Sequence, residues 1–112
     1  MGKPLSIRPE QLAALSEDRR RQFEDRVTVM LATRGRRDET RALVRYGIER
    51  ARVHGIVRER EVLGYIQLMR RFGADFDSDP RHAWAHPILS GERRDAVHST
   101  AALLFAAADE QP

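Results

Sequence analysis

The chain of 112 residues contains no cysteine, which excludes disulfide bonds, thiolate metal sites and cysteine nucleophiles. It also contains no asparagine, and every basic side chain except Lys3 is an arginine. Only 6% of the residues are aromatic, so aliphatic side chains and alanine must fill most of any core. The core is therefore expected to be that of a small aliphatic domain that needs no disulfide or metal.

Long hydrophobic runs are missing as well. The longest uncharged stretch, residues 96–108, is interrupted by His98, Ser99 and Thr100 and is shorter than the roughly 20 apolar residues that cross a bilayer. The first residues, MGKPLSIRPEQL, lack the apolar run of a signal peptide. We therefore expect a soluble, cytoplasmic protein with no membrane partner.

Charge is abundant and unevenly distributed. Residues 1–60 hold 15 Lys and Arg against 9 Asp and Glu, whereas residues 61–112 hold 5 against 8. The first half is therefore basic and the second half acidic, although the net charge is only +3. Such asymmetry favours a charged partner that binds in one orientation.

Size and periodicity predict one all-α domain over residues 1–112, with frayed ends at 1–6 and 109–112. A chain of this length has no room for a second core. Apolar residues recur at helical spacing, and no segment alternates in the manner of a half-buried strand. We expect a compact bundle of four main helices, one short N-terminal helix, and one long ordered loop at about 73–90.

The N-terminal helices are predicted from their start signals. Pro9 suits the first position of a short helix that ends at Leu15. Ser16 is a plausible N-cap for a longer helix that runs to about Arg34. The spacing of that helix predicts a buried face, which consists of Phe23, Val27, Met30 and Leu31.

The remaining helices have comparable signals. Asp38 and Ser90 are candidate N-caps, and Gly55 and Gly73 can end helices in a left-handed conformation. Gly47 and Gly64 lie inside helices, where they would permit close contact with a neighbouring helix. We expect helices at about 38–54, 58–72 and 91–108.

The stretch DFDSDP in the long loop places Asp75, Asp77 and Asp79 at positions 1, 3 and 5 of a calcium-binding loop. Pro80 then replaces the required glycine, and His86 replaces the required glutamate. We therefore predict no metal site. Asp79 is instead expected to cap a turn that begins at Pro80, and the other two carboxylates to be solvated or paired with arginines.

Histidines supply the other candidate chemistry. His82 and His86 are four residues apart, but prolines bracket them and no zinc-protease glutamate accompanies them. His54 and His98 are isolated, and each is expected at a helix end or on the surface. The chain also lacks a nucleophile elbow and a glycine-rich phosphate loop. The expectation is a protein without catalytic residues or a cofactor.

An Arg-rich face over residues 19–52 suggests nucleic-acid binding as the alternative function. Its arginines include Arg19, Arg20, Arg21, Arg26, Arg36, Arg37, Arg41, Arg45 and Arg52. Acidic residues are interleaved among them, as on an ordinary solvated helix surface. The absence of asparagine and the scattered glutamines also disfavour base recognition.

Aromatic residues gather around the long loop. Phe76 and Trp84, with Ile88 and Leu89, could anchor this segment across the open end of the bundle. They could also form an interface hot spot rimmed by charge, although the anchoring interpretation is favoured for Trp84. The candidate partner-binding residues are Asp75, Phe76, Asp77, Asp79, Arg81 and Trp84.

Residues 45–89 carry the pattern helix–YGI–helix–LM–G–DFD–DP–WA–IL. This stretch resembles small helical bacterial proteins encoded beside type VI secretion effectors and related polymorphic toxins. The resemblance implies an accessory role, as a chaperone or adaptor of an effector, or as an immunity protein against one. It implies no catalytic residue. The predicted function is therefore a non-enzymatic protein-binding module.

Overall fold

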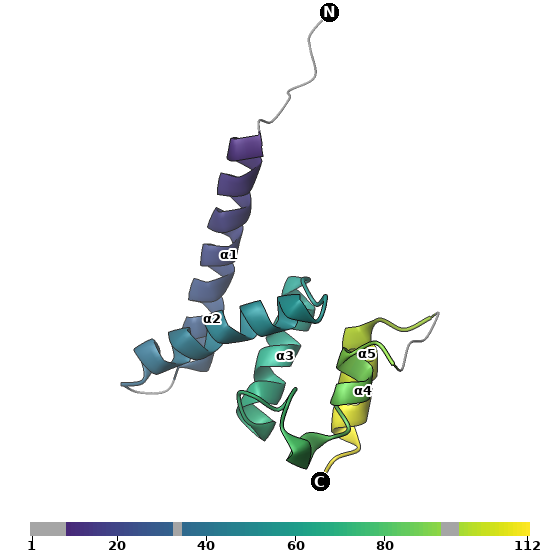
Figure 1. The fold of residues 1–112 in the computed structure, drawn as a ribbon. Coiled ribbons are helices and arrows are strands. Elements are labelled where there is room, and N and C mark those ends of the chain that lie inside the picture. The colour runs from purple at the N-terminus through teal and green to yellow at the C-terminus, as the bar shows by residue number, and fades with distance from the viewer. Residues whose placement is uncertain (1–8, 33–34, 93–96) are drawn as a thin grey trace, which may run out of the picture. The chain divides into compact units, whose positions relative to one another are not determined.

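The computed structural model describes residues 9–32, 35–92 and 97–112, with side chains from Glu17 onward. These residues form helices and turns and contain no strand, which confirms the all-α prediction (Figure 1). None of the described helices is long and apolar enough to cross a membrane. The helices are α1 Pro9–Leu31, α2 Arg37–Val53, α3 Glu59–Phe72, α4 His86–Leu89 and α5 Thr100–Asp109, with a 3-10 helix, η1, at Pro80–His82. Residues 1–41 and 42–112 form two compact units.

In the first unit, α1 is one continuous helix, so the predicted separate short helix and the N-cap at Ser16 are wrong. No glycine or proline follows Pro9 within α1, and the residues around Ser16 are good helix formers. The helix ends at Leu31, before the predicted end at Arg34, which lies outside the described residues. Phe23 and Val27 are buried as predicted, but Met30 is 57% exposed.

An ion-pair cluster joins the two helical segments of this unit. Arg41 Nη1 lies 2.9 Å from Glu24 Oε1 and 2.7 Å from Asp25 Oδ1. Hydrogen bonds to Asp25 and Glu24 raise the pKa of Arg41, so its charge is retained at any physiological pH. One arginine of the predicted Arg-rich face is therefore already occupied by carboxylates.

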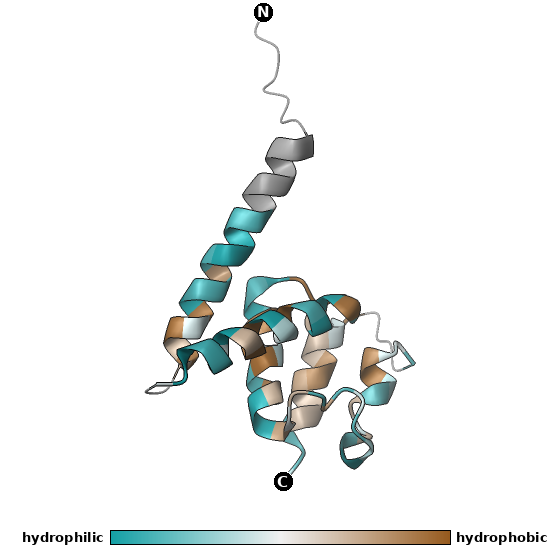
Figure 2. Ribbon diagram, turned by 60° about the vertical axis from the view of Figure 1, so that its left-hand side comes forward, coloured by the Kyte–Doolittle hydropathy of each residue, from teal (hydrophilic) through white to brown (hydrophobic). Residues whose placement is uncertain are grey.

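In the second unit, glycines allow helices to approach closely. A Cβ atom on Gly47 would lie 2.6 Å from Ile66 Cγ1 and 2.9 Å from Met69 Sδ, so α2 and α3 touch at this point. A Cβ atom on Gly64 would lie 2.5 Å from the Phe105 Cζ atom, which places α5 directly against α3. These contacts confirm the predicted roles of both glycines. Figure 2 shows hydrophobic (brown) positions on these helices.

The turn between α2 and α3 is fixed by two backbone hydrogen bonds. The Gly55 N–H donates to the Arg52 carbonyl at 2.9 Å, and the Ile56 N–H donates to the Ala51 carbonyl at 2.8 Å. Together they form a Schellman motif, for which Gly55 adopts the expected positive φ of 77°. The Ile56 side chain is only 2% exposed, so this turn is anchored in the core.

The last helix begins later than predicted. α5 starts at Thr100, and its N-cap is Ser99, whose hydroxyl accepts a hydrogen bond from the Ala102 N–H at 3.1 Å. Ser90 instead ends α4. The predicted start at Gly91 is wrong because this residue has a φ of +84°, which is incompatible with a helix. Residues 93–96 lie outside the described part of the chain.

The C-terminal residues, which were expected to be frayed, are hydrogen-bonded. Asp109 belongs to α5, and Arg71 Nη2 donates to the Gln111 carbonyl at 3.0 Å. The Gln111 side chain donates to the Ala107 carbonyl at 3.0 Å. The other predicted frayed end, residues 1–6, lies outside the described residues.

Candidate functional site

The segment 73–90 follows α3 as a series of turns, with η1 and α4 inside it (Figure 1). Its backbone is held by local hydrogen bonds, which run from the Phe76 N–H to the Gly73 carbonyl and from the Ser78 N–H to the Asp75 carbonyl. We call residues 73–90 the connecting segment. It is the ordered loop that was predicted, although η1 and α4 make 7 of its 18 residues helical.

The three aspartates of this segment point to three different partners. Asp75 accepts a hydrogen bond from the Tyr46 hydroxyl. Asp77 is buried and pairs with residues of α2 and the turn after it. Asp79 accepts the Arg81 backbone N–H at 2.9 Å and thereby caps η1, as predicted. No group of three potential metal-ligating side chains occurs among the described residues.

Asp77 is the centre of a buried polar cluster. Its side chain is 0% exposed. Its Oδ2 atom accepts Arg50 Nε at 2.9 Å, accepts Arg50 Nη2, and lies 2.8 Å from His54 Nε2. Burial alone would raise the pKa of this carboxyl, but the hydrogen bonds to His54 and Arg50 outweigh it and lower the pKa. Asp77 is therefore a buried carboxylate that remains charged at neutral pH.

Tyr65 completes this cluster from α3. Its hydroxyl and Asp77 Oδ1 are the buried side-chain polar atoms for which the described residues provide no hydrogen-bond partner. Burial raises the pKa of Tyr65, and the negative charge of Asp77 raises it further. Tyr65 is therefore a neutral phenol next to a carboxylate.

One face of α2 supplies most of the partners of this segment. Tyr46, Arg50 and His54 follow one another at i, i+4 and i+8, which is the spacing of a single helix face. They meet Asp75 and Asp77, which are two residues apart. This match was not predicted from the sequence, which placed His54 at a helix end or on the surface. His54 does follow the end of α2, but only 15% of its side chain is exposed.

Aromatic rings anchor the rest of the connecting segment. Phe76 is 1% exposed, and its ring centroid lies 5.1 Å from that of Tyr65 and 6.2 Å from that of Trp84. Phe72 packs edge-on against Trp84 at 5.2 Å and against His82 at 5.1 Å. These contacts confirm the anchoring interpretation. Trp84 is half-buried, between the core and the surface.

The six predicted partner-binding residues therefore divide into two groups. Phe76 and Asp77 are interior residues and cannot touch a partner in this conformation. Asp75 and Arg81 are exposed, while Asp79 and Trp84 are partly exposed. The side chain of Arg81 is 84% exposed and 2.9 Å from Asp79. Partner binding by the four accessible residues stays a prediction.

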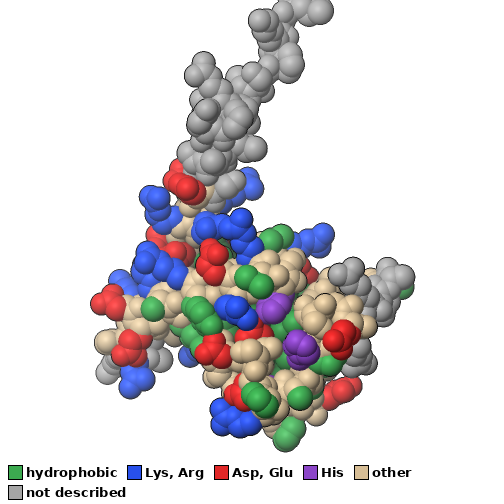
Figure 3. All heavy atoms as spheres, viewed as in Figure 1, with side chains coloured by type: hydrophobic (Ala, Val, Ile, Leu, Met, Phe, Trp, Pro, Cys, Tyr) green, Lys and Arg blue, Asp and Glu red, His purple; other side chains and the backbone are tan. Residues whose placement is uncertain are grey.

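The Arg-rich face has fewer available arginines than its sequence suggests. Arg41 is paired with Glu24 and Asp25, and Arg50 with Asp77. Figure 3 shows acidic (red) and basic (blue) side chains interspersed along α1 and α2. Such mixing weakens the attraction for a phosphate backbone, which requires an uninterrupted positive surface.

No family model, curated protein or solved structure matches this chain.

Proposed function

We propose that this chain is a non-enzymatic protein-binding module, which serves as an accessory or immunity partner of a bacterial toxin or secreted effector. It would contact that partner through the exposed side chains of the connecting segment. The observation that carries the proposal is the anchoring of this segment by the buried Asp77 carboxylate.

The anchoring matters because binding by a mobile loop costs conformational entropy. Each side chain that a partner immobilises costs about 0.5–1.5 kcal/mol, and ordering of the backbone adds to this. Asp77 and Phe76 hold the segment from inside the molecule, so its backbone is ordered before any partner arrives. The exposed Asp75 and Arg81 are thus presented on a prearranged surface.

The resemblance described above supports the same assignment. The stretch 45–89 that carries it contains both sides of the anchor. The hydroxyl of Tyr46 in the YGI motif donates a hydrogen bond to Asp75 in the DFD motif. Asp77, the second aspartate of that motif, is hydrogen-bonded to Arg50 and His54. The recurring pattern thus coincides with residues that shape the connecting segment, and a role shared with the effector-associated proteins would use that segment.

A pair of charge reversals tests the proposal. Arg81→Glu alters the exposed surface of the connecting segment, whereas Arg19→Glu makes the same change on α1, within the Arg-rich face. Both side chains are exposed, so circular dichroism should show unchanged folding. Each variant is co-expressed with the product of the neighbouring gene, and the complex is analysed by size-exclusion chromatography and titration calorimetry.

The wild type and Arg19→Glu should co-elute with the partner, and Arg81→Glu should bind at least about tenfold more weakly. Separate elution of the wild-type proteins at micromolar concentration would sink the proposal. A loss of binding in Arg19→Glu alone would move the contact surface to the Arg-rich face.

A further inference from the structure

The turn between α2 and α3 exposes two aliphatic side chains that the proposed contact surface does not use. Val53 is 70% exposed and Val57 is 69% exposed. They flank Gly55 and Ile56, whose backbone hydrogen bonds and buried side chain fix the turn. The two valines are therefore held outward by an ordered turn. Figure 2 shows hydrophobic (brown) colouring in this part of the ribbon.

Arginines lie close to these valines in the chain. Arg52, Arg58 and Arg60 are all exposed and lie within three residues of one or both of them in the chain. The carboxylate of Glu61 accepts a hydrogen bond from the Ser99 hydroxyl at 3.2 Å, and Glu59 also interacts within the chain. Both glutamates lie in the first turn of α3, where they face the positive end of the helix. The exposed charges next to the two valines are therefore three arginines and Glu59.

We propose that this basic corner, defined as Arg52, Val53, Val57, Arg58 and Arg60, is a second docking surface that binds an acidic protein segment with aliphatic side chains. The apolar centre would accept the aliphatic groups and the arginines the carboxylates, in the usual arrangement of an apolar core with a charged rim. The inference rests on the proposed protein-binding function, to which it adds a second surface and the chemistry of its ligand.

The composition of the corner favours protein over the other polyanions. A nucleic acid would use the arginines but leave Val53 and Val57 without a role, since phosphates make no apolar contact. An anionic membrane surface is usually engaged by larger side chains such as Trp, Phe and Leu, and the corner has only valines. Arginine beside an aliphatic group fits a carboxylate-rich polypeptide best.

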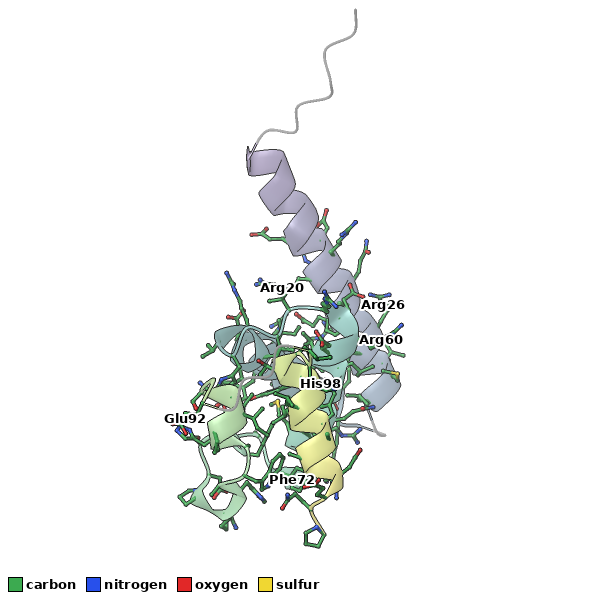
Figure 4. The ribbon with its side chains drawn as sticks, turned by 90° about the vertical axis from the view of Figure 1, so that its right-hand side faces the viewer. Arg20, Arg26, Arg60, Phe72, Glu92 and His98 are labelled. Atoms are coloured by element: carbon green, nitrogen blue, oxygen red, sulfur yellow. The ribbon has the colours of Figure 1, made fainter. Side chains whose placement is uncertain are left out.

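Arg60 of the basic corner and the connecting segment lie at opposite ends of α3, whereas Val53 directly precedes His54, which contacts Asp77. Arg60 lies in the first turn of this helix and Phe72 at its last residue, where the connecting segment follows (Figure 4). Fourteen helical residues span roughly 21 Å. Arg60 and Arg81 are both exposed and neither belongs to the Asp77 cluster, so a substitution at one can serve as the control for a substitution at the other.

A labelled peptide built from leucine at helical spacing with glutamate between the leucines is the probe. Its affinity for the full chain is measured by fluorescence anisotropy at about 50 and about 300 mM salt. We expect micromolar binding that weakens with salt. A peptide with serine in place of leucine should bind about tenfold more weakly or not at all.

Two protein variants locate the binding site. The double variant Val53→Ser/Val57→Ser should weaken binding by about tenfold at both salt concentrations, because it removes the apolar centre. Arg60→Glu should weaken binding chiefly at low salt, and glutamate in the first turn of α3 leaves the helix intact. The matched control, Arg81→Glu, should bind the peptide like the wild type.

Equal weakening in Arg81→Glu, or no peptide binding by the wild type, would overturn the inference. It would also fall if duplex DNA, or vesicles of phosphatidylcholine with phosphatidylglycerol, bound the same residues more tightly than the peptide. These results are independent of the co-elution experiment. If the chain binds its partner through the connecting segment but does not bind the peptide, the proposed function stands. Only the assignment of the basic corner as a docking surface is then overturned.

Discussion

Asp77 combines full burial with a negative charge, and the chain compensates for this at two positions. Arg50 and His54 both approach Oδ2, which restores part of the solvation that the carboxylate loses in the interior. Forming such a cluster contributes little net stability. Removing one partner destabilises the fold more strongly, because the remaining buried groups then have neither a partner nor water. The Asp77 side chain is therefore expected to affect the stability of the fold.

Asp77→Ala is expected to lower the free energy of unfolding by about 2–4 kcal/mol, because Arg50 would remain partly buried without its carboxylate. Asp75→Ala, at an exposed aspartate two residues earlier, should cost less than about 1 kcal/mol. Urea denaturation monitored by circular dichroism gives both values. Equal values for the two variants would contradict the assigned role of Asp77.

The acid side of the stability profile should also depend on Asp77. Its pKa is lowered in the folded state, so its contribution to stability is present above the unfolded pKa of about 3.9 and is lost as the pH falls through the folded value. Asp77→Asn should therefore unfold with a weaker pH dependence than the wild type below about pH 4. Urea titrations at each pH give the free energy of unfolding of both proteins. An equal change of this free energy with pH in the two proteins would refute the lowered pKa.

Tyr65 is expected to affect the stability of the fold at alkaline pH. Burial raises its pKa, so its contribution is complete below the unfolded value of about 10 and is lost as the pH rises through the folded value. Tyr65→Phe should flatten the fall in thermal stability above about pH 10. Because the hydroxyl lacks a hydrogen-bond partner among the described residues, the same variant should differ by at most about 1 kcal/mol at neutral pH. A larger loss at neutral pH would reveal a hydrogen bond to Asp77.

At the scale of elements, side chains of α2 and of the turn after it hold the connecting segment by hydrogen bonds. Three side chains one helical turn apart (Tyr46, Arg50 and His54) meet two aspartates that lie in consecutive turns. These hydrogen bonds, rather than any local sequence signal, fix the position of the segment relative to α2.

The start of α5 offers a second test at this scale. Ser99 caps the helix and also donates to Glu61, whereas Ser90 ends α4. Ser99→Ala should cost about 1 kcal/mol of stability through loss of the cap. Ser90→Ala should be within about 0.5 kcal/mol of the wild type. Thermal melts of both variants measure the difference, and a reversed order would contradict the assignment of Ser99 as the N-cap of α5.

On the scale of the whole molecule, the core is concentrated in the second unit. Among the described residues, all buried apolar side chains except Phe23 and Val27 lie after residue 41. This set includes Tyr65, Phe76 and Leu104, each at most 1% exposed. The connecting segment and the basic corner both belong to this unit.

A fragment of residues 36–112, which keeps α2 intact, should therefore fold by itself. We expect a cooperative thermal transition and dispersed amide resonances in a proton–nitrogen correlation spectrum. The full chain under the same conditions is the control. A fragment with a broad transition and collapsed resonances would show that residues 9–31 are required for the core.

Local signals in the sequence were sufficient for much of the fold. Gly55 and Gly73 end helices because few other residues tolerate a positive φ, and Asp79 caps the turn at Pro80 because its carboxylate accepts the Arg81 backbone N–H. The two serines near α5 show where such signals fail. Ser90 and Ser99 are equally good caps in sequence, and the positive φ of Gly91 decided between them.

The sequence by itself determined the all-α class, the helix ends at glycine, the close approaches at Gly47 and Gly64, and the anchoring of the connecting segment by aromatic residues. These features depend on neighbours within a few residues or on periodic burial. Only the tertiary structure decided that Asp77 is buried between Arg50, His54 and Tyr65 while Asp75 and Asp79 face outward. Residues more than 20 positions apart have to meet to form that cluster, and no local pattern specifies which carboxylate enters the core.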